Sequence, residues 1–593
     1  MKRSVFRNRA LPYLLVLPQV AVTVVFFFWP AFESLRLSLF RTSPFGDKTS
    51  FVGLENFRKL LTTPEYYQSI ANTFVFASGV TAIGLGAGLF VAALATQKIR
   101  GLAAYRTAVL WPYGIAPPIA GIIFLFIFHP SYGVLPYWLG FVTSYEFNWL
   151  LKGWVAMALV ILATAWTHVG YDIAFFLAGL LAIPTSVLEA ASVDGAGAIR
   201  RFRSIIFPLL SPITFYLLVV NLIFSFFGSF GVIHAVTQGG PGGATEIMVF
   251  KSVQGRLHRA EPRVLRGPVR AADDPGDHPD GAPVPLRREA SDLLVSAGGT
   301  FAAPARVAAL PRVVEAPRRR AFDWGSVVVH ALLLICVAVI AFPLYYAFVI
   351  STQTVQEVVA RPPILRPSGH LLENYAEAWG RSRMPRLLWN SAIVAVVSAL
   401  GKIAISMLSA FAIVYFNFRG KAIAFWLIFI TLMLPVEVRI MSTYEVIGSL
   451  GWLNSYAGLT VPLMASATAT FLFRQFYMTV PNELVEAAQL DGVGPLRFLW
   501  AFLLPLSWAN IAALFVVLFI FGWNQYLWPL MITNSEAMRV VVIGLQDLIP
   551  RTGTHVPEWN VMMAAAMMAL LPPVAVILVM QRWFVKGLIE TEK

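Results

Sequence analysis

Eleven apolar segments, each about long enough to cross a lipid bilayer, constrain this chain more than any other feature of its sequence. A membrane-spanning helix needs about 20 consecutive apolar residues, and a single such stretch could equally be a buried helix of a soluble protein. Eleven of them in 593 residues indicate an integral membrane protein. The segments lie near 11–33, 72–96, 107–128, 154–180, 206–230, 325–350, 388–416, 422–441, 456–474, 505–530 and 559–580.

The composition excludes the main alternative classes of protein. Only 13% of the residues are charged and 58% are hydrophobic, whereas a soluble domain carries about 25% charged residues. A soluble multi-domain enzyme and a disordered chain are therefore excluded. The single cysteine, Cys336, excludes a disulfide scaffold and is interpreted as a small buried hydrophobe. The net charge of +14 is typical of nucleic-acid binding, but with this hydropathy it favours arginine-rich cytoplasmic loops, and no nucleic-acid partner is expected.

Lysine and arginine in the short loops predict the orientation of the chain, because cytoplasmic loops are enriched in them. The basic N-terminus, MKRSVFRNRA, is not followed by a small-residue cleavage site, so we expect it to be retained and cytoplasmic. The loops around 34–70, 351–387 and 531–558 are expected outside. The cations behind this prediction are Lys2, Arg3, Arg7, Arg9, Lys98, Arg100, Arg106, Arg200, Arg201, Arg203, Arg318, Arg319, Arg320, Arg419, Lys421, Arg497, Arg582 and Lys586.

The segment 253–320 is predicted to be a linker between two halves. Residues 251–320 contain twelve Arg, one Lys and nine Pro, and no sustained apolar run. A chain that starts in the cytoplasm and crosses the membrane five times emerges on the outside. The basic cluster Arg318–Arg320 nevertheless predicts that the start of the second half is cytoplasmic, so one crossing is missing. Because an arginine at a helix centre costs about 3 kcal/mol on insertion scales, the linker does not supply it. We hypothesise that 254–290 is translated out of frame and that the true frame encodes a sixth span and the end of a separate first subunit. A natural linker that re-enters the membrane is the alternative.

An internal repeat lies between the fourth and fifth spans of each half, on the predicted cytoplasmic side. Residues 184–208 read PTSVLEAASVDGAGAIRRFRSIIFP, and residues 481–505 read PNELVEAAQLDGVGPLRFLWAFLLP. Both copies contain Pro, Glu-Ala-Ala, Asp-Gly, Gly, Arg and Pro at the same spacing, and the outer prolines are 24 positions apart in each. Asn72 and Asn390, near the start of the second span of each half, form a weaker second repeat.

Each copy of the main repeat predicts a short helix at the membrane surface. Pro184 and Pro481 are typical of the first helical turn, while Gly195 and Gly492 end the helix and permit a turn. The small alanines allow a partner surface to approach closely. An ordinary amphipathic interface helix is the alternative, but two matched copies favour docking into another protein. The candidate docking residues are Glu189, Ala190, Ala191, Asp194, Gly195, Glu486, Ala487, Ala488, Asp491 and Gly492.

The sequences EAASVDGAG and EAAQLDGVG resemble the EAA loops of the permeases of binding-protein-dependent ABC importers. The resemblance covers roughly 1–252 and 320–593. It implies an all-α integral membrane protein built from two pseudo-equivalent halves, 1–252 and 321–593, with the type I ABC importer permease fold. Twelve spans are then expected and about eleven are visible. The resemblance also implies that each repeat is a coupling helix that docks on a cytoplasmic ABC ATPase dimer.

Further segments outside the repeat also resemble this family. The segment TQGGPGGATE at 237–246, which includes Gly239, Gly240 and Pro241, matches the loop that meets the periplasmic solute-binding protein in this family. The segments WNQYLWPL at 523–530, LPP at 571–573 and the C-terminal QRWFVKGLIETEK look most like the permease pair of sn-glycerol-3-phosphate importers. The resemblance thus implies that both permease halves are fused in one multi-pass protein of the bacterial inner membrane, surrounded by membrane lipid.

The resemblance implies a transport permease and not an enzyme. The sequence has no GxxxxGK[ST] loop, so ATP would be used by a separate ATPase and no cofactor or metal ion would be bound by this chain. A permease for a disaccharide or another small solute of the same group is an alternative. An ion-driven secondary transporter is a second alternative, although Asp172 is nearly alone among intramembrane carboxylates. The product of a damaged gene fusion is a third.

A phosphorylated solute would need cations or oriented hydrogen-bond donors along its path. Ionisable residues inside a span usually face a cavity, and Arg439 and Arg474 lie within or near spans. His168 is alternatively the donor of a structural hydrogen bond, and Trp523 a belt residue at the membrane interface. The candidates for the solute path are His168, Asp172, Trp523, Asn524 and Gln525.

Overall fold

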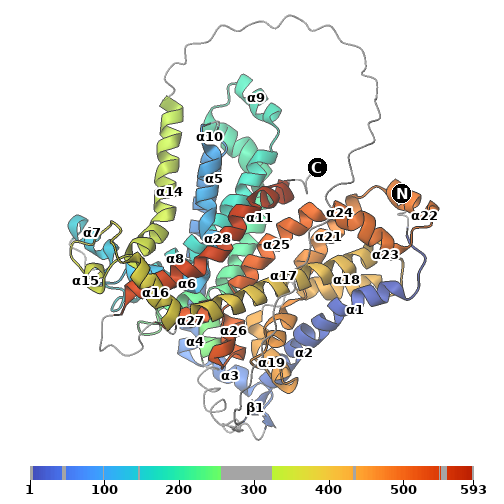
Figure 1. Cartoon of the computed structure of the whole chain (residues 1–593), viewed down its shortest axis with the longest axis horizontal. Coiled ribbons are helices and arrows are strands. Elements are labelled where there is room, and N and C mark those ends of the chain that lie inside the picture. Colours follow the sequence, from blue (N-terminus) through green and yellow to red (C-terminus); the bar gives the residue numbers. More distant parts are fainter. Residues whose placement is uncertain are drawn as a thin grey trace, which may run out of the picture.

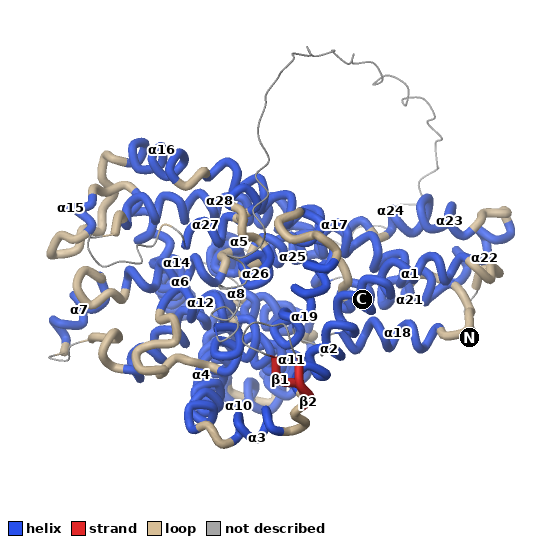
Figure 2. The backbone as a smooth tube through the Cα atoms, turned by 90° about the horizontal axis from the view of Figure 1, so that it is seen from below, coloured by secondary structure: helices blue, strands red, loops and turns tan. Residues whose placement is uncertain are grey.

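The computed structural model describes residues 5–42, 49–97, 99–143, 147–254, 324–431, 436–546, 548 and 557–589. Most of the predicted linker and the segment assigned to a frame shift lie outside these residues. The described chain is helical, with one small departure from the all-α prediction (Figure 2). Strands β1 (Phe40–Thr42) and β2 (Thr49–Phe51) form an antiparallel pair in which Phe40 lies opposite Phe51.

Helices occupy every one of the eleven predicted apolar segments. Within the described residues, seven helices are long and apolar enough to span a membrane, and three bent pairs raise this number to ten. The long helices are α1–η1–α2 (Leu11–Thr23, Val24–Phe28, Trp29–Ser38), α4 (Pro64–Leu94), α8 (Gly153–Ala182), α10–η3–α11–η4 (Ala198–Arg201, Phe202–Ile206, Phe207–Ile223, Phe224–Gly228), α14 (Trp324–Ser351), α17 (Met384–Tyr415) and α28 (Trp559–Ile589).

The remaining segments are bent or interrupted. The bent pairs are α5–η2 (Leu102–Leu110, Trp111–Gly114) with α6 (Pro117–Ile127), α20–η6 (Tyr456–Thr460, Val461–Leu463) with α21 (Ala467–Thr479), and α23–η7–α24 (Pro495–Phe498, Leu499–Leu503, Leu504–Leu506) with α25 (Trp508–Trp523). The eleventh segment holds α18 (Lys421–Ile430) and α19 (Val436–Ser449). Shorter helices are α3 (Glu55–Leu61), α7 (Val134–Val142), α9 (Thr185–Val193), α12 (Phe230–Val236), α15 (Val355–Val358), α16 (Leu371–Arg381), α22 (Asn482–Leu490), α26 (Leu527–Ile532), η8 (Glu536–Met538) and α27 (Val541–Gln546).

The two halves exchange their first spans (Figure 1). Helix α1 packs on α17 and α18 of the second half, whereas α14 packs on α28 of its own half and also on α4, α5 and α6 of the first half. Buried polar contacts fix both exchanges: the Gln19 amide donates to Thr470 Oγ1 at 2.6 Å, and Trp166 Nε1 donates to the carbonyl of Ile340 at 3.0 Å. The predicted halves are therefore interlocked and do not simply lie side by side.

Glycines let two spans of the first half approach closely. Helix α4 packs along α8, and a Cβ added at Gly88 would lie 2.7 Å from Cβ of Asp172 and 3.3 Å from its carbonyl carbon. A Cβ at Gly84 would lie 2.6 Å from Oδ2 of the same aspartate. Small residues commonly mediate such close packing between membrane helices. The contact buries the Asp172 carboxylate, which accepts a hydrogen bond from Asn221 Nδ2 at 2.7 Å.

We expect Gly88→Val to destabilise the protein by about 1–3 kcal/mol, because the added side chain overpacks the contact between α4 and α8. Gly86→Val is the matched control, since Gly86 lies on the same helix and an added Cβ there meets nothing within 4 Å. The midpoints of thermal unfolding of the two purified variants measure the difference. Equal midpoints would contradict the prediction.

Candidate functional site

The two predicted coupling elements fold alike. Helix α9 follows Pro184 and α22 follows Pro481, and each proline is the N-cap residue just before the first helical turn. The prediction that these prolines occupy the first turn was thus wrong by one residue. Both helices are nine residues long, and each ends one residue before its aspartate, Asp194 or Asp491. The sequence repeat is therefore also a structural repeat.

Each coupling helix ends in the predicted glycine turn. Gly195 has φ +75° and Gly492 has φ +73°, a left-handed conformation that glycine adopts without steric cost. The amide of the following residue closes the turn: Ala196 N donates to Ala191 O at 2.9 Å, and Val493 N donates to Ala488 O at 2.8 Å. These bonds are the Schellman arrangement that ends many helices. The turn predicted from the two glycines is confirmed in both halves.

The two coupling helices also expose equivalent side chains. The first alanine of each pair, Ala190 or Ala487, is exposed, whereas the second, Ala191 or Ala488, is buried. At the tips, Val193 is 87% exposed and Leu490 is 89% exposed. A single exposed apolar side chain is normal on a protein surface, so the informative feature is that both helices present one at the same position. The other candidate residues, Glu189, Asp194, Gly195, Glu486, Asp491 and Gly492, are exposed as well.

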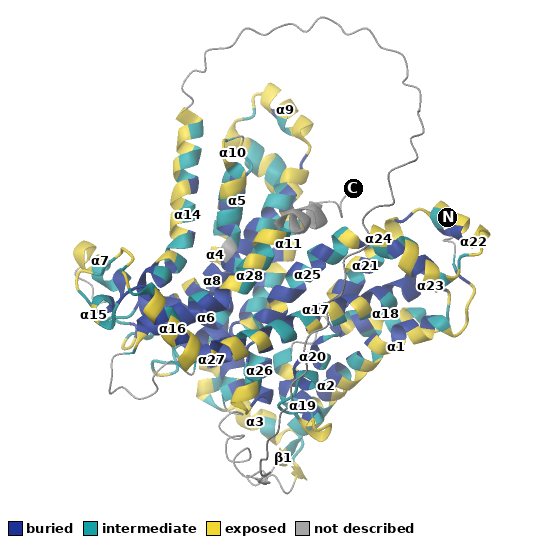
Figure 3. Cartoon of the chain, in the orientation of Figure 1, coloured by how far each residue is buried: buried dark blue, intermediate teal, exposed yellow. Residues whose placement is uncertain are grey.

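The two coupling helices stand well apart at the edge of the molecule, α9 on the first half and α22 on the second (Figure 1). Both are rich in exposed residues (Figure 3). The N-terminal segment lies beside α22, because Gln489 Nε2 donates to Val5 O at 3.2 Å and Phe6 N donates to Tyr415 O at 2.9 Å. The N-terminus and α22 therefore share one side of the protein.

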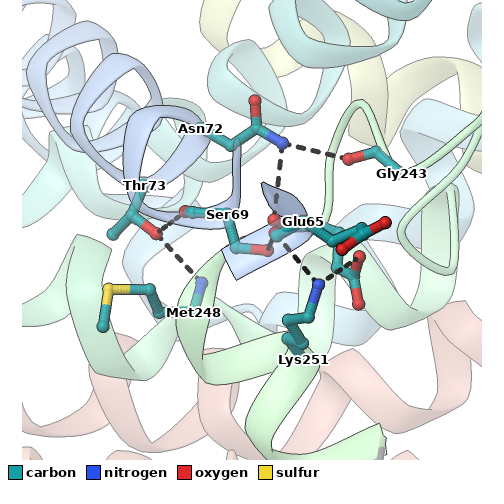
Figure 4. A network of polar contacts seen from close by, with 8 residues as sticks. Glu65, Ser69, Asn72, Thr73, Gly243, Met248 and Lys251 are labelled. Atoms are coloured by element: carbon teal, nitrogen blue, oxygen red, sulfur yellow. Dashed lines mark hydrogen bonds and ion pairs between the residues drawn. The ribbon is translucent and has the colours of Figure 1, made fainter. Parts of the chain in front are cut away.

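A pair of side chains near the start of α4 holds the outer loop of the first half (Figure 4). Asn72 Nδ2 donates to the carbonyl of Gly243 at 3.0 Å and to that of Glu246 at 3.4 Å. The neighbouring Thr73 Oγ1 accepts a hydrogen bond from the amide of Met248 at 2.9 Å. We call this arrangement the asparagine clamp of the first half.

The same clamp recurs in the second half. Asn390 Nδ2, on α17, donates to the carbonyls of Ala537 and Arg539, both at 2.9 Å. The neighbouring Ser391 Oγ accepts from the amide of Val541 at 2.8 Å. The weak sequence repeat at Asn72 and Asn390 is therefore a repeated structural device that ties the second span of each half to a later loop of the same half, which is predicted to lie outside.

The outer loop of the first half forms an ordered turn above its clamp. Gly239 is buried with φ +87°, and an added Cβ would lie 2.9 Å from the ring of Phe250. Thr245 Oγ1 donates to the carbonyl of Gly240 at 2.9 Å. These contacts fix the segment that includes Gly240 and Pro241, while Gln238 and Gly242 on either side of it are exposed.

A polar cluster joins the halves close to this loop. Tyr526, from the WNQYLWPL segment, lies with its hydroxyl 2.9 Å from His234 Nδ1 and donates a hydrogen bond to Gln546 Oε1. His234 Nδ1 is also 3.1 Å from Gln546 Oε1. His234 belongs to α12 and Gln546 to α27, so one residue of the first half meets two of the second. Sequence reasoning missed this cluster, although the segment that contains Tyr526 had been singled out.

The predicted solute-path residues fall into two separate groups. In the first half, the ring of His168 stacks on Phe224 with 4.3 Å between ring centroids, and its Nε2 atom has no hydrogen-bond partner among the described residues. Asp172 lies one helical turn further along α8. In the second half, Trp523 is buried and donates to the carbonyl of Ala569 at 3.2 Å, so it is a core residue and not a belt residue.

The polar residues that follow Trp523 remain candidates. Gln525 Nε2 donates to the carbonyl of Phe521 at 3.3 Å, and Asn524 Oδ1 has no partner within the described part of the chain. Arg439 has a different role, because its buried guanidinium donates to the carbonyl of Phe26 at 2.5 Å and thereby links α19 to the first span. In the described ranges, no hydrogen bond or ring contact joins the first-half group to the second-half group.

Comparisons with known proteins match both halves. Residues 84–255 and 402–590 match the family described as "Binding-protein-dependent transport system inner membrane component". Each matched range contains one coupling element. Similar curated proteins include the sn-glycerol-3-phosphate transport system permease proteins UgpE of Brucella melitensis and Agrobacterium fabrum. They are 55% identical over 277 and 276 residues, which are 45% of this chain and 98% of each relative.

Two solved structures are also similar to part of the chain. One is a bacterial ABC transporter involved in the import of the acidic polysaccharide alginate, with TM-score 0.41 and 19% identity over 45% of this chain and 99% of that one. The other is a bacterial alginate ABC transporter in complex with its alginate pentasaccharide-bound periplasmic protein. It has TM-score 0.36 and 20% identity over 43% of this chain and 84% of that one.

Proposed function

Because this chain belongs to the family of binding-protein-dependent transport system inner membrane components, we propose that it forms both halves of the membrane pathway of an ABC importer for sn-glycerol 3-phosphate. Membership of the family makes it a multi-pass transport permease and disfavours an ion-driven secondary transporter. The 55% identity to permeases named for sn-glycerol-3-phosphate supports the choice of solute over a disaccharide.

The observation that carries the proposal is the pair of matched coupling helices, α9 and α22. Each presents an exposed apolar residue at its tip, Val193 or Leu490, and each is anchored by the same glycine turn. We infer that the two subunits of a cytoplasmic ATPase dimer each receive one of these helices. ATP binding and hydrolysis by that dimer would move the helices, and this chain itself would hydrolyse nothing. The N-terminus, which lies beside α22, would then be cytoplasmic.

The outer side of the protein would receive the solute-binding protein. The ordered turn at Gly239, Gly240 and Pro241 is the proposed contact. The first asparagine clamp would transmit its position to α4, and the second clamp would hold the loop at 537–541 on α17 in the same way. The cluster of His234, Tyr526 and Gln546 would hold the halves together outside while the pathway is open to the cytoplasm. Rocking of pseudo-equivalent halves about a site at their interface is a general scheme of membrane transport.

Uptake by the reconstituted complex tests this proposal. Proteoliposomes would contain the purified chain with the ATPase of a related importer inside and a glycerol-3-phosphate-binding protein outside. We expect accumulation of radiolabelled sn-glycerol 3-phosphate that requires ATP and the binding protein. Accumulation of maltose in place of the phosphate ester would favour the disaccharide alternative, and uptake driven by a proton or sodium gradient without ATP would contradict the proposal.

We also propose that the first half is completed by a sixth span that this reading frame does not encode. The helical backbone already begins again at residues 248–254, and the counterpart α27 in the second half precedes the last span, α28. The DNA over codons 245–325 decides the question. If no alternative frame there encodes about 20 apolar residues, the frame-shift hypothesis is wrong and a natural linker remains.

A further inference from the structure

Lys402 is a buried lysine inside the span formed by α17. Its side chain is only 6% exposed, and its Nζ atom lies 4.0 Å from the centroid of the Phe521 ring on α25. Among the described residues it has no ion pair or hydrogen bond. A charged side chain within a membrane helix is expensive, and such residues mark solute or ion pathways. Lys402 therefore needs an anionic partner that the protein itself does not supply in its described part.

Lys402 lies at the centre of a polar stripe on the buried face of α17. Ser398 and Ser406 lie one helical turn to either side, Ser409 lies two turns on, and all three are buried. The opposite face carries the exposed side chain of Leu400. Ser406 Oγ donates to Ser466 O, but Ser398 Oγ and Ser409 Oγ have no hydrogen-bond partner in the described ranges. Buried polar groups are normally hydrogen-bonded, so the stripe has unused capacity for a polar ligand.

The side of α25 that meets Lys402 belongs to the predicted solute path. Phe521 is 47% exposed although α25 packs against both α17 and α28. Gln525 lies one turn beyond Phe521 and bonds to its carbonyl, and the side-chain oxygen of Asn524 has no partner within the described chain. The packing of α25 on α17 thus brings the predicted polar residues after Trp523 to the same end of the helix as the ring that covers Lys402.

We propose that Lys402 binds the phosphate group of the transported solute, with the Ser398 hydroxyl as a neighbouring hydrogen-bond donor. This inference rests on the proposed function, which supplies a solute with a phosphate. An ammonium group carries three N–H donors, and charge-assisted hydrogen bonds from nitrogen to phosphate oxygen are strong. The aromatic ring accommodates the cation while no solute is bound, and the phosphate displaces the ring from the ammonium when it arrives.

Two substitutions at Lys402 test the role of its charge in the reconstituted complex. We expect Lys402→Gln to raise the KM for sn-glycerol 3-phosphate uptake about tenfold or more, as loss of a hydrogen bond to a charged group implies. Lys402→Arg keeps the cation, so its KM is expected to stay within about threefold of the wild-type KM. This change is smaller than the loss of one hydrogen bond to a charged group would cause. Arg36→Gln is the control and is expected to leave KM unchanged, because that guanidinium also lies over an aromatic ring, 5.3 Å from the centroid of Phe40, but is not among the candidates for the solute path.

The outcomes separate this inference from the proposed function. Absence of sn-glycerol 3-phosphate uptake by the wild-type complex would reject the proposed solute. Normal wild-type uptake with an unchanged KM in Lys402→Gln would overturn only the role of Lys402. Binding-protein-stimulated ATP hydrolysis by each variant is measured in parallel. It is expected to stay within about twofold of wild type, because the coupling helices are untouched.

A smaller substitution keeps the inference testable if Lys402→Gln does not assemble. Ser398→Cys replaces one oxygen by sulfur. The wild-type chain is the control, because its single cysteine, Cys336, gives the background level of thiol labelling. Because Ser398 is buried in the described conformation, we expect a water-soluble thiol reagent to label Ser398→Cys above that background only when ATP turnover opens the solute path. Addition of sn-glycerol 3-phosphate with its binding protein should slow the labelling. No labelling above background, or labelling that the solute does not slow, would overturn the proposal.

Discussion

Gly492→Val is expected to reduce attachment of the ATPase and ATP-driven uptake about tenfold, whereas Gly494→Val leaves both near the wild-type level. Gly492 has φ +73°, and an added Cβ meets nothing within 4 Å. The effect would therefore come from the backbone conformation alone, which costs an L-residue about 1–2 kcal/mol and a β-branched one more. Gly494 also lies in open space but has φ −70°, so valine fits there.

The first half offers the same matched pair. Gly195 has φ +75° and Gly197 has φ −64°, and an added Cβ at either meets nothing within 4 Å. Co-purification of the ATPase with each of the four valine variants measures attachment, and vesicle uptake measures coupling. If Gly195→Val and Gly492→Val both retained the ATPase as well as their controls do, the two turns would not be the docking elements.

Loss of both asparagine clamps is expected to abolish stimulation by the binding protein while the ATPase stays attached. In Asn72→Leu with Asn390→Leu, each clamp loses two hydrogen bonds to backbone carbonyls. Leaving such groups without partners costs about 1–3 kcal/mol each. The outer loops would then no longer hold the position that the binding protein recognises.

Binding-protein-stimulated ATP hydrolysis and basal hydrolysis, measured in the same vesicles, test the clamp prediction. Gln97→Leu serves as the control, because this exposed amide lies just beyond the other end of α4. The single variants are expected to lose stimulation in part, and their effects should add if the two clamps act independently. Full stimulation of the double variant would mean that the clamps are not needed to position the outer loops.

The helical segments could be predicted from the sequence because the length of an apolar run is a direct physical requirement of the bilayer. The packing of α1 and α14 on the opposite halves could not be predicted from the sequence, because hydropathy carries no information about which helix packs on which. The bend between α24 and α25 was also missed. An apolar run such as 505–530 predicts a crossing but not whether its helix is straight.

The candidate site shows the same division. The coupling helices were predicted because their residues recur at one spacing, and the structure confirms their glycine turns. The clamps were only suspected at Asn72 and Asn390, because their partners are backbone carbonyls and leave no signature in the sequence. Lys402 was missed because it is one cation in the apolar run 388–416. Its burial becomes evident only when α25 lies beside α17.

The exchange of first spans has a consequence for how the protein is made. Since α1 packs on α17 and α18, the earliest helix to leave the ribosome waits for its site until most of the chain has been inserted. Helix α14 in turn reaches its site on α4, α5 and α6 only after the linker has been translated. Each half therefore packs on a span that the other half supplies, so the two parts of the chain are expected to assemble together and not one after the other.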